Sequence, residues 1–258
     1  MKGKSMKIIQ ITDCHIKKET DSLMYGVNPR KKLENITNYI SNNIKDFDFV
    51  ILTGDISDDG SIESYNFVVN SLQKINKKIY FINGNHDSKS NLIKVFSESH
   101  NFFHLKELWL ENWLFLGADS CIEGKDYGVL SNQELQRIDT NIKQAKIKNY
   151  NCAVITHHHP VAVGTPLIDD CPMLNGHDLV NVLNKYDNVK VLITGHVHNH
   201  YSIKIGNTYN LEAGPSSFAQ FKYNGSNENN DIDNKTYGFK MYEFFDGYYE
   251  ISCKLFCE

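Results

Sequence analysis

Short apolar runs of β-forming residues alternate with longer polar stretches of helical periodicity up to about residue 199. Each apolar run has the length of a buried strand, which predicts strands at 7–12, 49–53, 78–82, 113–118, 152–156 and 189–194. Between them, apolar residues recur every three or four positions, which predicts helices at 29–45, 62–75, 91–97, 132–146 and 178–186. Because strands that alternate with helices form sheets covered by those helices, the pattern predicts an α/β fold.

The remainder of the chain has a different pattern, with strands only. They are expected at 200–205, 208–213, 238–245 and 248–255, and Asp246-Gly247 is typical of a type I′ hairpin turn. Residues 216–237, rich in Asn, Asp, Ser and Gly, show no periodicity and predict an irregular loop near the functional site. Since neither a linker nor an internal repeat divides the chain, we expect one domain over residues 1–258.

The composition argues against several classes of protein. The chain has 27 Lys and Arg against 31 Asp and Glu, a net charge of −4, whereas binders of the nucleic-acid backbone are usually basic. No apolar run is long enough for a membrane span, and no signal-peptide core follows the basic start. Six scattered cysteines without a C-x-x-C pair fit free thiols. We therefore expect a cytoplasmic monomer or homodimer that binds neither nucleic acid nor membrane.

Side chains that can bind metals directly follow five of the predicted strands. In chain order they are Asp13 and His15; Asp55, Asp58 and Asp59; Asn85, His86 and Asp87; His157, His158 and His159; and His196 and His198. Ligand sites in α/β sheets lie at the carboxyl ends of the strands, so these groups are expected to share one site. Oxygen and nitrogen donors of this kind suit Mn, Fe, Zn or Co. They exceed the four ligands of a closed tetrahedral site and fit two ions about 3.5–4 Å apart.

The same residues form five sequence blocks, D-x-H, G-D, G-N-H-D, a single His and G-H-x-H, in that order from Asp13 to His198. The chain thereby resembles the calcineurin-like metallophosphoesterases, and within them the bacterial class III cyclic nucleotide phosphodiesterases. The tripeptides Gly26-Val27-Asn28 and Gln220-Phe221-Lys222 add to the similarity. The resemblance implies a four-layer α/β/β/α sandwich that hydrolyses 3′,5′-cyclic AMP, a small-molecule cyclic nucleotide, to 5′-AMP.

The resemblance also implies a role for each matching residue. One divalent ion would be held by Asp13, His15, Asp55 and His198, and the other by Asp55, Asn85, His157 and His196, with Asp55 as the bridge. The substrate would be contacted by His15, Asn85, His86 and His198. A hydroxide between the two ions would then attack phosphorus in line.

His86 is the expected general acid for the departing oxygen. A carboxylate three or four residues after Asp55 would orient it through a hydrogen bond. We favour Asp58 for this task over Asp59, which would then be a turn residue before Gly60.

Alternatives remain for some neighbouring residues and for the function. We favour a bystander role for His158 and His159, although strand alternation would allow His159 to face the site. The irregular loop at 216–237, called the late loop below, contains Phe218, Phe221 and Tyr223. These aromatic residues either pack the late loop onto the sheet, which we favour, or stack on the base of a bound nucleotide. The substrate would otherwise be another small ester, a glycerophosphodiester or a 2′,3′-cyclic nucleotide. A catalytically silent binding module of the same fold would instead contain no metal.

Overall fold

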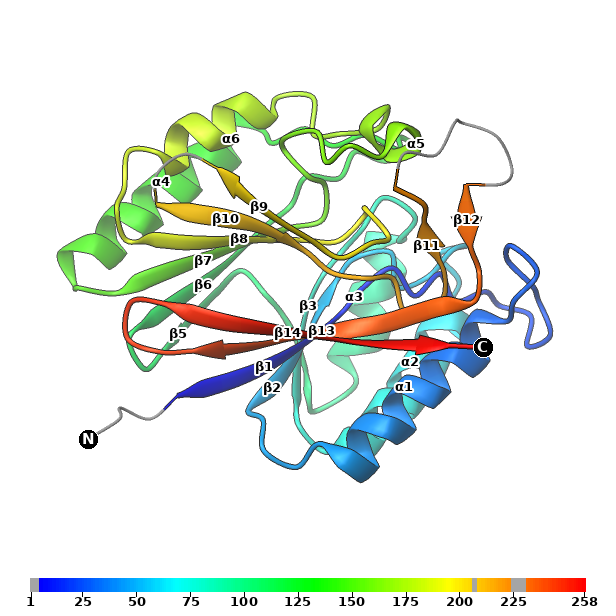
Figure 1. Cartoon of the computed structure of the whole chain (residues 1–258). Helices are drawn as coiled ribbons and strands as arrows, with labels where there is room; N and C mark the ends of the chain where they lie inside the picture. Colours follow the sequence, from blue (N-terminus) through cyan, green and yellow to red (C-terminus); the bar gives the residue numbers. More distant parts are fainter. Residues whose placement is uncertain (1–4, 206–207, 224–230) are drawn as a thin grey trace.

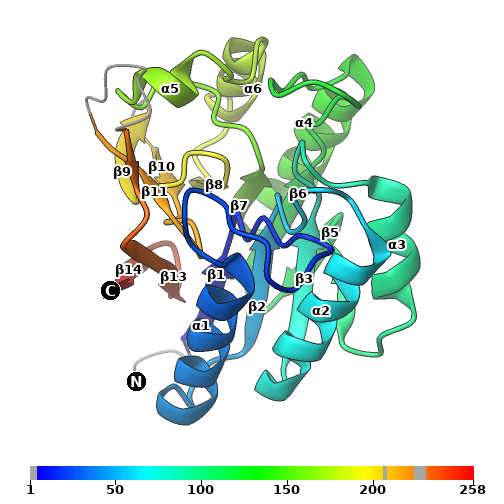
Figure 2. The ribbon, with the colours of Figure 1, turned by 90° about the vertical axis from the view of Figure 1, so that its right-hand side faces the viewer.

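Two sheets lie face to face, with helices on the outer face of each (Figures 1 and 2). The computed structural model describes residues 5–205, 208–223 and 231–258, and within these residues each of the two sheets has six strands. In spatial order, the first sheet contains β14 (Tyr249–Cys257), β13 (Thr236–Phe244), β1 (Met6–Ile11), β2 (Phe49–Thr53), β3 (Lys78–Ile82) and β4 (Phe102–His104). The second contains β5 (Glu107–Leu110), β6 (Trp113–Ala118), β7 (Asn151–Thr156), β8 (Val189–Thr194), β10 (Tyr209–Ala213) and β9 (Tyr201–Ile205).

Three hydrophobic cores separate the layers. The helices α1 (Pro29–Asn43), α2 (Ile62–Leu72) and α3 (Lys89–Ser97) pack on the first sheet through a core that includes Ile36. The helices α4 (Asn132–Ile147) and α6 (Gly176–Leu183) pack on the second through a core that includes Ile142. A third core, with Phe115, fills the space between the sheets. The layers are therefore α/β/β/α, which confirms the predicted fold class. No helix among the described residues has the length and apolar character of a membrane span.

The central strands explain why the apolar runs are continuous. In β7, Val154 faces the core under the helices whereas Ile155 faces the core between the sheets. Strands buried on both faces read as unbroken apolar runs rather than as an alternating pattern. β1, β2 and β3 are parallel to one another, as are β6, β7 and β8. Their carboxyl ends therefore lie at one edge of each sheet.

The structure also contains strands that the periodicity did not predict. β4 and β5 are short, and the apolar run of β5 has only three residues, Leu108, Trp109 and Leu110, which is too short to predict a strand. Residues 216–237, expected to be irregular, contain β11 (Gln220–Phe221) paired with β12 (Ile232–Asp233), although 224–230 lie outside the described residues. At the end of α2, a 3-10 turn, η1 (Gln73–Ile75), replaces the last turn of the predicted helix.

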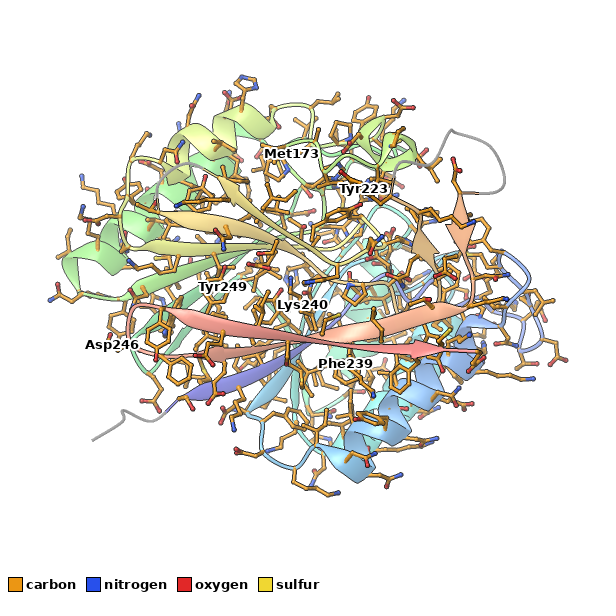
Figure 3. The ribbon with its side chains drawn as sticks, viewed as in Figure 1. Met173, Tyr223, Phe239, Lys240, Asp246 and Tyr249 are labelled. Carbon is orange, nitrogen blue, oxygen red and sulfur yellow. The ribbon has the colours of Figure 1, made fainter. Side chains whose placement is uncertain are left out.

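A buried ion pair joins the two sheets. Lys240 Nζ of β13 lies 2.7 Å from Glu212 Oε2 of β10, and both side chains are almost fully buried. Lys240 also donates to the carbonyl oxygens of Tyr201 and Ala213, while Glu212 accepts from the hydroxyl of Tyr249 at 2.8 Å. Figure 3 shows Lys240 and Tyr249 in the space between the sheets. Both charges are therefore compensated by several hydrogen bonds, as a buried pair requires.

Replacing Lys240 should cost far more stability than replacing an exposed lysine. We expect Lys240→Ala to lower the free energy of unfolding by about 3–5 kcal/mol, because Glu212 would remain buried without its partner. In the control, Lys185→Ala removes a pair with Asp139 that lies partly in solvent, and the expected loss is below about 1 kcal/mol. Urea denaturation measures both. Equal losses would contradict the compensation of charge between the sheets.

Candidate metal centre

The polar residues that follow the parallel strands meet at the edge of the molecule that faces the viewer in Figure 2. Donor atoms of Asp13, His15 and His198 lie within 4.8 Å of one another, and so do those of Asp13, Asp55 and His157. These side chains come from the ends of β1, β2, β7 and β8, and therefore from both sheets. The structure thus brings together residues that are up to 185 positions apart, since Asp13 and His198 belong to one group.

One half of the cluster contains two imidazoles whose Nε2 atoms face each other. His15 Nε2 lies 3.0 Å from His198 Nε2 and 3.6 Å from Asp55 Oδ2. His198 Nε2 lies 3.7 Å from Asp13 Oδ1. All of these side chains are buried.

The other half is formed by residues that follow β2, β3, β7 and β8. His157 Nε2 lies 3.3 Å from Asp55 Oδ2 and 3.0 Å from Asn85 Oδ1. The ring of His196 lies 5.0 Å from that of His157. Asp55 Oδ2 is therefore close to one imidazole of each half, His15 and His157.

Hydrogen bonds to groups around the cluster fix the orientation of its imidazole rings. His157 Nδ1 donates to the carbonyl of Thr53 at 2.8 Å, and His198 Nδ1 donates to that of Ala219 at 3.2 Å. His15 Nδ1 donates to the carboxylate of Asp58 at 3.1 Å. With the proton on Nδ1, the Nε2 of each neutral ring presents a lone pair to the cluster. Two lone pairs at 3.0 Å repel unless a proton or a cation lies between them, so this donor set fits a metal ion.

His196 is oriented in the opposite sense. Its Nε2 donates to the carbonyl of Cys171 at 2.9 Å, which leaves Nδ1 as its free donor atom. Its backbone N–H donates to Asp13 Oδ1 at 2.9 Å, so Asp13 also positions the loop that follows β8.

The backbone at the cluster is strained. Asp13, His15, Asp55, His196 and His198 have φ angles between 46° and 66°. Non-glycine residues rarely adopt this left-handed conformation, which costs on the order of 1–2 kcal/mol for each residue. Such strain persists only where the surrounding structure enforces it, and it is typical of functional sites.

Two glycines make the close approach of the loops possible. A Cβ atom on Gly84 would lie 2.1 Å from Asp55 Oδ1, and one on Gly54 would lie 2.4 Å from the Nδ1 of His157. Gly54 also has a φ of 94°, which favours glycine. The glycines of the G-D and G-N-H-D blocks are therefore required by the packing of the ligands themselves.

Burial and charge shift the pKa values of the cluster in opposite directions. Burial raises the pKa of Asp13 to about 6. Asp55 is also buried, but the nearby imidazoles of His157 and His15 outweigh this effect and hold the pKa of Asp55 well below its usual value. Burial disfavours the charge on His157, yet the Asp55 and Asp13 carboxylates raise its pKa to about 9. Burial and neighbouring imidazoles lower the pKa of His198. A bound cation would favour the deprotonated form of every group.

His86 lies at the rim of the cluster, where its side chain is 36% exposed. Its Nδ1 is 3.4 Å from Asp58 Oδ1, and its ring meets that of His15 edge to face at 4.7 Å. Burial opposes the charge on Asp58, but the hydrogen bonds from His15 and a neighbouring lysine lower its pKa to about 2. Asp59 instead accepts hydrogen bonds from the backbone N–H of Lys18, in the loop after β1, and from that of Ser61 in its own turn. Of the two candidate carboxylates, Asp58 is therefore the one beside His86.

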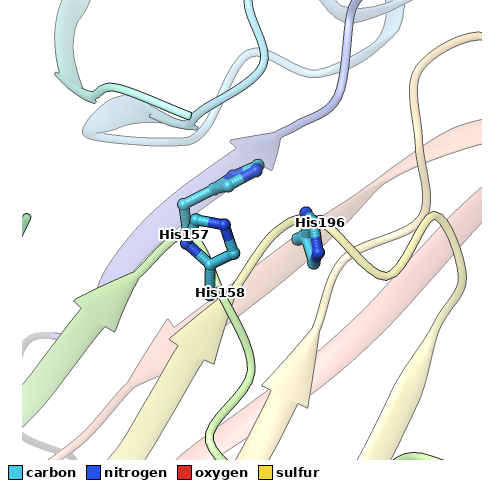
Figure 4. A group of neighbouring side chains, drawn as sticks. All are labelled: His157, His158 and His196. Atoms are coloured by element: carbon cyan, nitrogen blue, oxygen red, sulfur yellow. The ribbon is translucent and has the colours of Figure 1, made fainter. Parts of the chain in front are cut away.

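His158 and His159 have partners outside the cluster, although His158 lies close to His157 and His196 (Figure 4). His158 Nδ1 lies 2.8 Å from the hydroxyl of Ser120, and its Nε2 donates to the carbonyl of Asp126 at 3.1 Å. Both ring nitrogens are thus engaged. His159 Nε2 lies 3.3 Å from Asp169 Oδ1 at the end of the helix α5 (Pro166–Asp169). His159 Nδ1, in contrast, is buried without a hydrogen-bond partner, and the His159 ring stacks on that of His196 with 5.7 Å between centroids.

The aromatic residues of the late loop differ in their surroundings. Phe218 and Phe221 are buried, and Phe221 stacks on His198 with 4.3 Å between ring centroids. Phe218 lies 5.4 Å from His15. These two rings pack the loop against His15 and His198. Tyr223 is 61% exposed and lies beside Gly164.

Asp87 is a functional residue to which the sequence analysis gave no role. Its carboxylate accepts from the backbone N–H groups of Ile56, Ser57 and Gly84 at 2.9–3.2 Å, and from the hydroxyl of Tyr65. It therefore joins the loop after β2 to the loop after β3. Its place in the G-N-H-D block was the available signal, but all its partners except Gly84 are 22 to 31 positions away in the sequence.

Comparison with known proteins agrees with this arrangement. The sequence pattern of the calcineurin-like phosphoesterase family matches residues 6–200. A 3′,5′-cyclic adenosine monophosphate phosphodiesterase, CpdA of Haemophilus influenzae, is 29% identical over 217 residues, which cover 84% of this chain and 78% of that protein. A probable glycerophosphodiester phosphodiesterase, GpdQ of Arcobacter nitrofigilis, is 34% identical over 200 residues, covering 75% of this chain and 72% of that protein. The crystal structure of a dimetal phosphatase from Danio rerio has the same fold, with a TM-score of 0.69, 14% identity and 98% coverage of both chains.

The neutral His158 should make stability depend on pH. Burial lowers the pKa of His158 in the native protein from 6.5 to about 3. Between these two pH values His158 is therefore protonated in the unfolded chain but neutral in the native protein. Stability from this residue is therefore present above pH 6.5 and is lost as the pH falls towards 3. We expect His158→Gln, which retains a donor and an acceptor, to reduce the slope of the unfolding free energy by about 1.4 kcal/mol per pH unit in this window. Urea denaturation at several pH values measures this slope.

Proposed function

Since this chain belongs to the calcineurin-like phosphoesterase family, we propose that it is a dinuclear-metal phosphodiesterase that hydrolyses 3′,5′-cyclic AMP to 5′-AMP. The observation that carries the proposal is the position of Asp55. Its Oδ2 lies 3.6 Å from His15 Nε2 and 3.3 Å from His157 Nε2, one from each half of the cluster. A carboxylate between two sets of donors is the arrangement expected of a residue shared by two ions.

The two halves of the cluster supply a ligand set for each ion. Asp13, His15, Asp55 and His198 would hold one, and Asp55, Asn85, His157 and His196 would hold the other. Their nitrogen and oxygen donors suit Mn or Fe, with Zn or Co as alternatives. When bound, such ions lower the pKa of a water molecule and polarise phosphoryl oxygens.

His86 is proposed as the general acid. It stands beside the cluster without belonging to either ligand set, and its half-exposed side chain is accessible to a substrate. Asp58 holds the His86 ring from the Nδ1 side, which leaves Nε2 for the substrate. A protonated His86 would give its proton to the ribose 3′-oxygen as the bond from this oxygen to phosphorus breaks. Asp58 also orients His15, so it would act on both residues as a positioning group.

Two observations bear on the substrate. Similarity to CpdA favours cyclic AMP, while similarity to GpdQ keeps a glycerophosphodiester as the second candidate. The net charge of −4 favours a small ester over a nucleic acid. Within the proposal the chain acts as one domain, in the cytoplasm, as a monomer or homodimer.

Metal removal and a substrate panel test the proposal. Chelated protein should lose phosphodiesterase activity and regain it with Mn²⁺ or Fe²⁺, with about two ions bound to each chain. On the reconstituted protein, kcat/KM should be higher for 3′,5′-cyclic AMP than for 2′,3′-cyclic AMP or glycerophosphoethanolamine. Asp55→Ala should lose more activity than Asn85→Ala, because Asp55 would serve both ions. Full activity in metal-free protein would refute the dinuclear proposal.

His86→Ala should keep both ions and lose turnover according to the leaving group. We expect a fall of about 10²–10⁴-fold on cyclic AMP, because an alkoxide needs a proton to depart. The fall should be much smaller on bis(p-nitrophenyl) phosphate, because its phenolate leaves readily. Steady-state kinetics and metal analysis measure the two effects. Equal losses on both substrates would make His86 a phosphate-positioning residue, and loss of metal would make it a ligand.

A further inference from the structure

A tight turn near the metal centre holds a tyrosine in an unfavourable conformation. Tyr25 and Gly26 have φ angles of 51° and 81°, and the flanking Met24 and Val27 exchange backbone hydrogen bonds of 2.8 and 3.1 Å. Two central residues with positive φ define a type I′ turn, whose first position favours Asn, Asp or Gly. A tyrosine at this position has a strained backbone, and backbone strain of this kind is concentrated at functional sites.

The Tyr25 ring is the outermost of a stack that begins at the metal centre. It lies 6.0 Å from the ring of Phe218, with only 8° between the planes. Phe218 in turn packs on His15 at 5.4 Å. The side-chain amide of Asn234 donates to the carbonyl of Tyr25 at 2.8 Å and so anchors the turn to the late loop. Tyr25 is 43% exposed, so part of its ring remains accessible.

Tyr25 also lines the pocket that leads to the metal centre. This pocket, of about 190 Å³, has His15, Asp55 and Asn85 among its lining residues. It has apolar walls as well, made by Met24 and Tyr25 of the turn and by Leu167 and Ile168 of α5 (Pro166–Asp169). A phosphate held at the cluster would therefore place the rest of its ester against apolar and aromatic side chains. A polar group such as glycerol would leave these walls without a matching partner.

We propose that Tyr25 is a specificity residue, whose ring stacks on the planar heteroaromatic base of a nucleotide ester bound at the metal centre. The inference rests on the proposed function and extends it, because it names the part of the substrate that the chain recognises. Bases stack on aromatic side chains largely irrespective of their hydrogen-bonding pattern. The contact therefore selects nucleotides over esters without a base, rather than one base over another.

Binding of the reaction product provides the test. Wild-type protein loaded with Mn²⁺ should bind 5′-AMP at least about 10-fold more tightly than ribose 5-phosphate, which lacks the base. Tyr25→Gly should lose most of this preference, and Tyr25→Phe should keep it. The control Tyr248→Ala, which removes another exposed tyrosine, in the hairpin between β13 and β14, should also keep it. Titration calorimetry measures the affinities.

Glycine at position 25 also separates recognition from a merely structural role. Because glycine accepts the positive φ, Tyr25→Gly should leave the melting temperature of the protein unchanged or raise it. A lower melting temperature together with equal affinity losses for 5′-AMP and ribose 5-phosphate would show a structural role and overturn the inference. The inference would also be overturned if the wild-type protein bound 5′-AMP no more tightly than ribose 5-phosphate. If the preference exists but cyclic AMP is not hydrolysed, the proposed function fails and the inference stands.

Discussion

Gln10 joins the two sheets directly beneath the metal centre. Its Nε2 donates to Thr53 Oγ1 of the first sheet and to the carbonyl of Thr194 of the second, both at 2.9 Å. Its Oε1 accepts from the hydroxyl of Tyr242 at 2.8 Å. Because Gln10 is fully buried, an unmade bond here would carry a desolvation penalty. Thr53 and Thr194 end β2 and β8, so the same bonds set the distance between the loops of Asp55 and His196.

The hydrogen bonds of Gln10 between the two sheets explain how the native fold holds together a cluster of groups that repel one another. The ligand residues combine left-handed backbone with facing lone pairs and buried carboxylates, each of which is unfavourable alone. Two sheets with a shared core hold them because the strands cannot move apart without exposing that core. Whatever binds the native centre and not the unfolded chain stabilises the fold by mass action. Cations that relieve the repulsion are therefore expected to stabilise the native protein.

The parts that the sequence predicted are those in which the signal is local. Asp13, Asp55 and His196 directly follow strands marked by continuous apolar runs, so their convergence follows from parallel sheets. β5 escaped prediction because this edge strand has only four residues and its apolar run only three. The role of Asp87 and the position of Tyr25 depend on loops that meet only in the folded chain. Tyr25 further contradicts the usual preference of its turn, so local rules point away from it.

The place of β13 has a consequence for how the protein matures. This strand lies between β14 and β1 in the first sheet, yet it is synthesised after His198, the last of the proposed ligands. Tyr242 of β13 reaches back across 232 positions to Gln10. All the ligand side chains therefore leave the ribosome before the scaffold that positions them is whole. We therefore expect the complete set of proposed ligands to be in place for metal binding only after β13 has joined the first sheet.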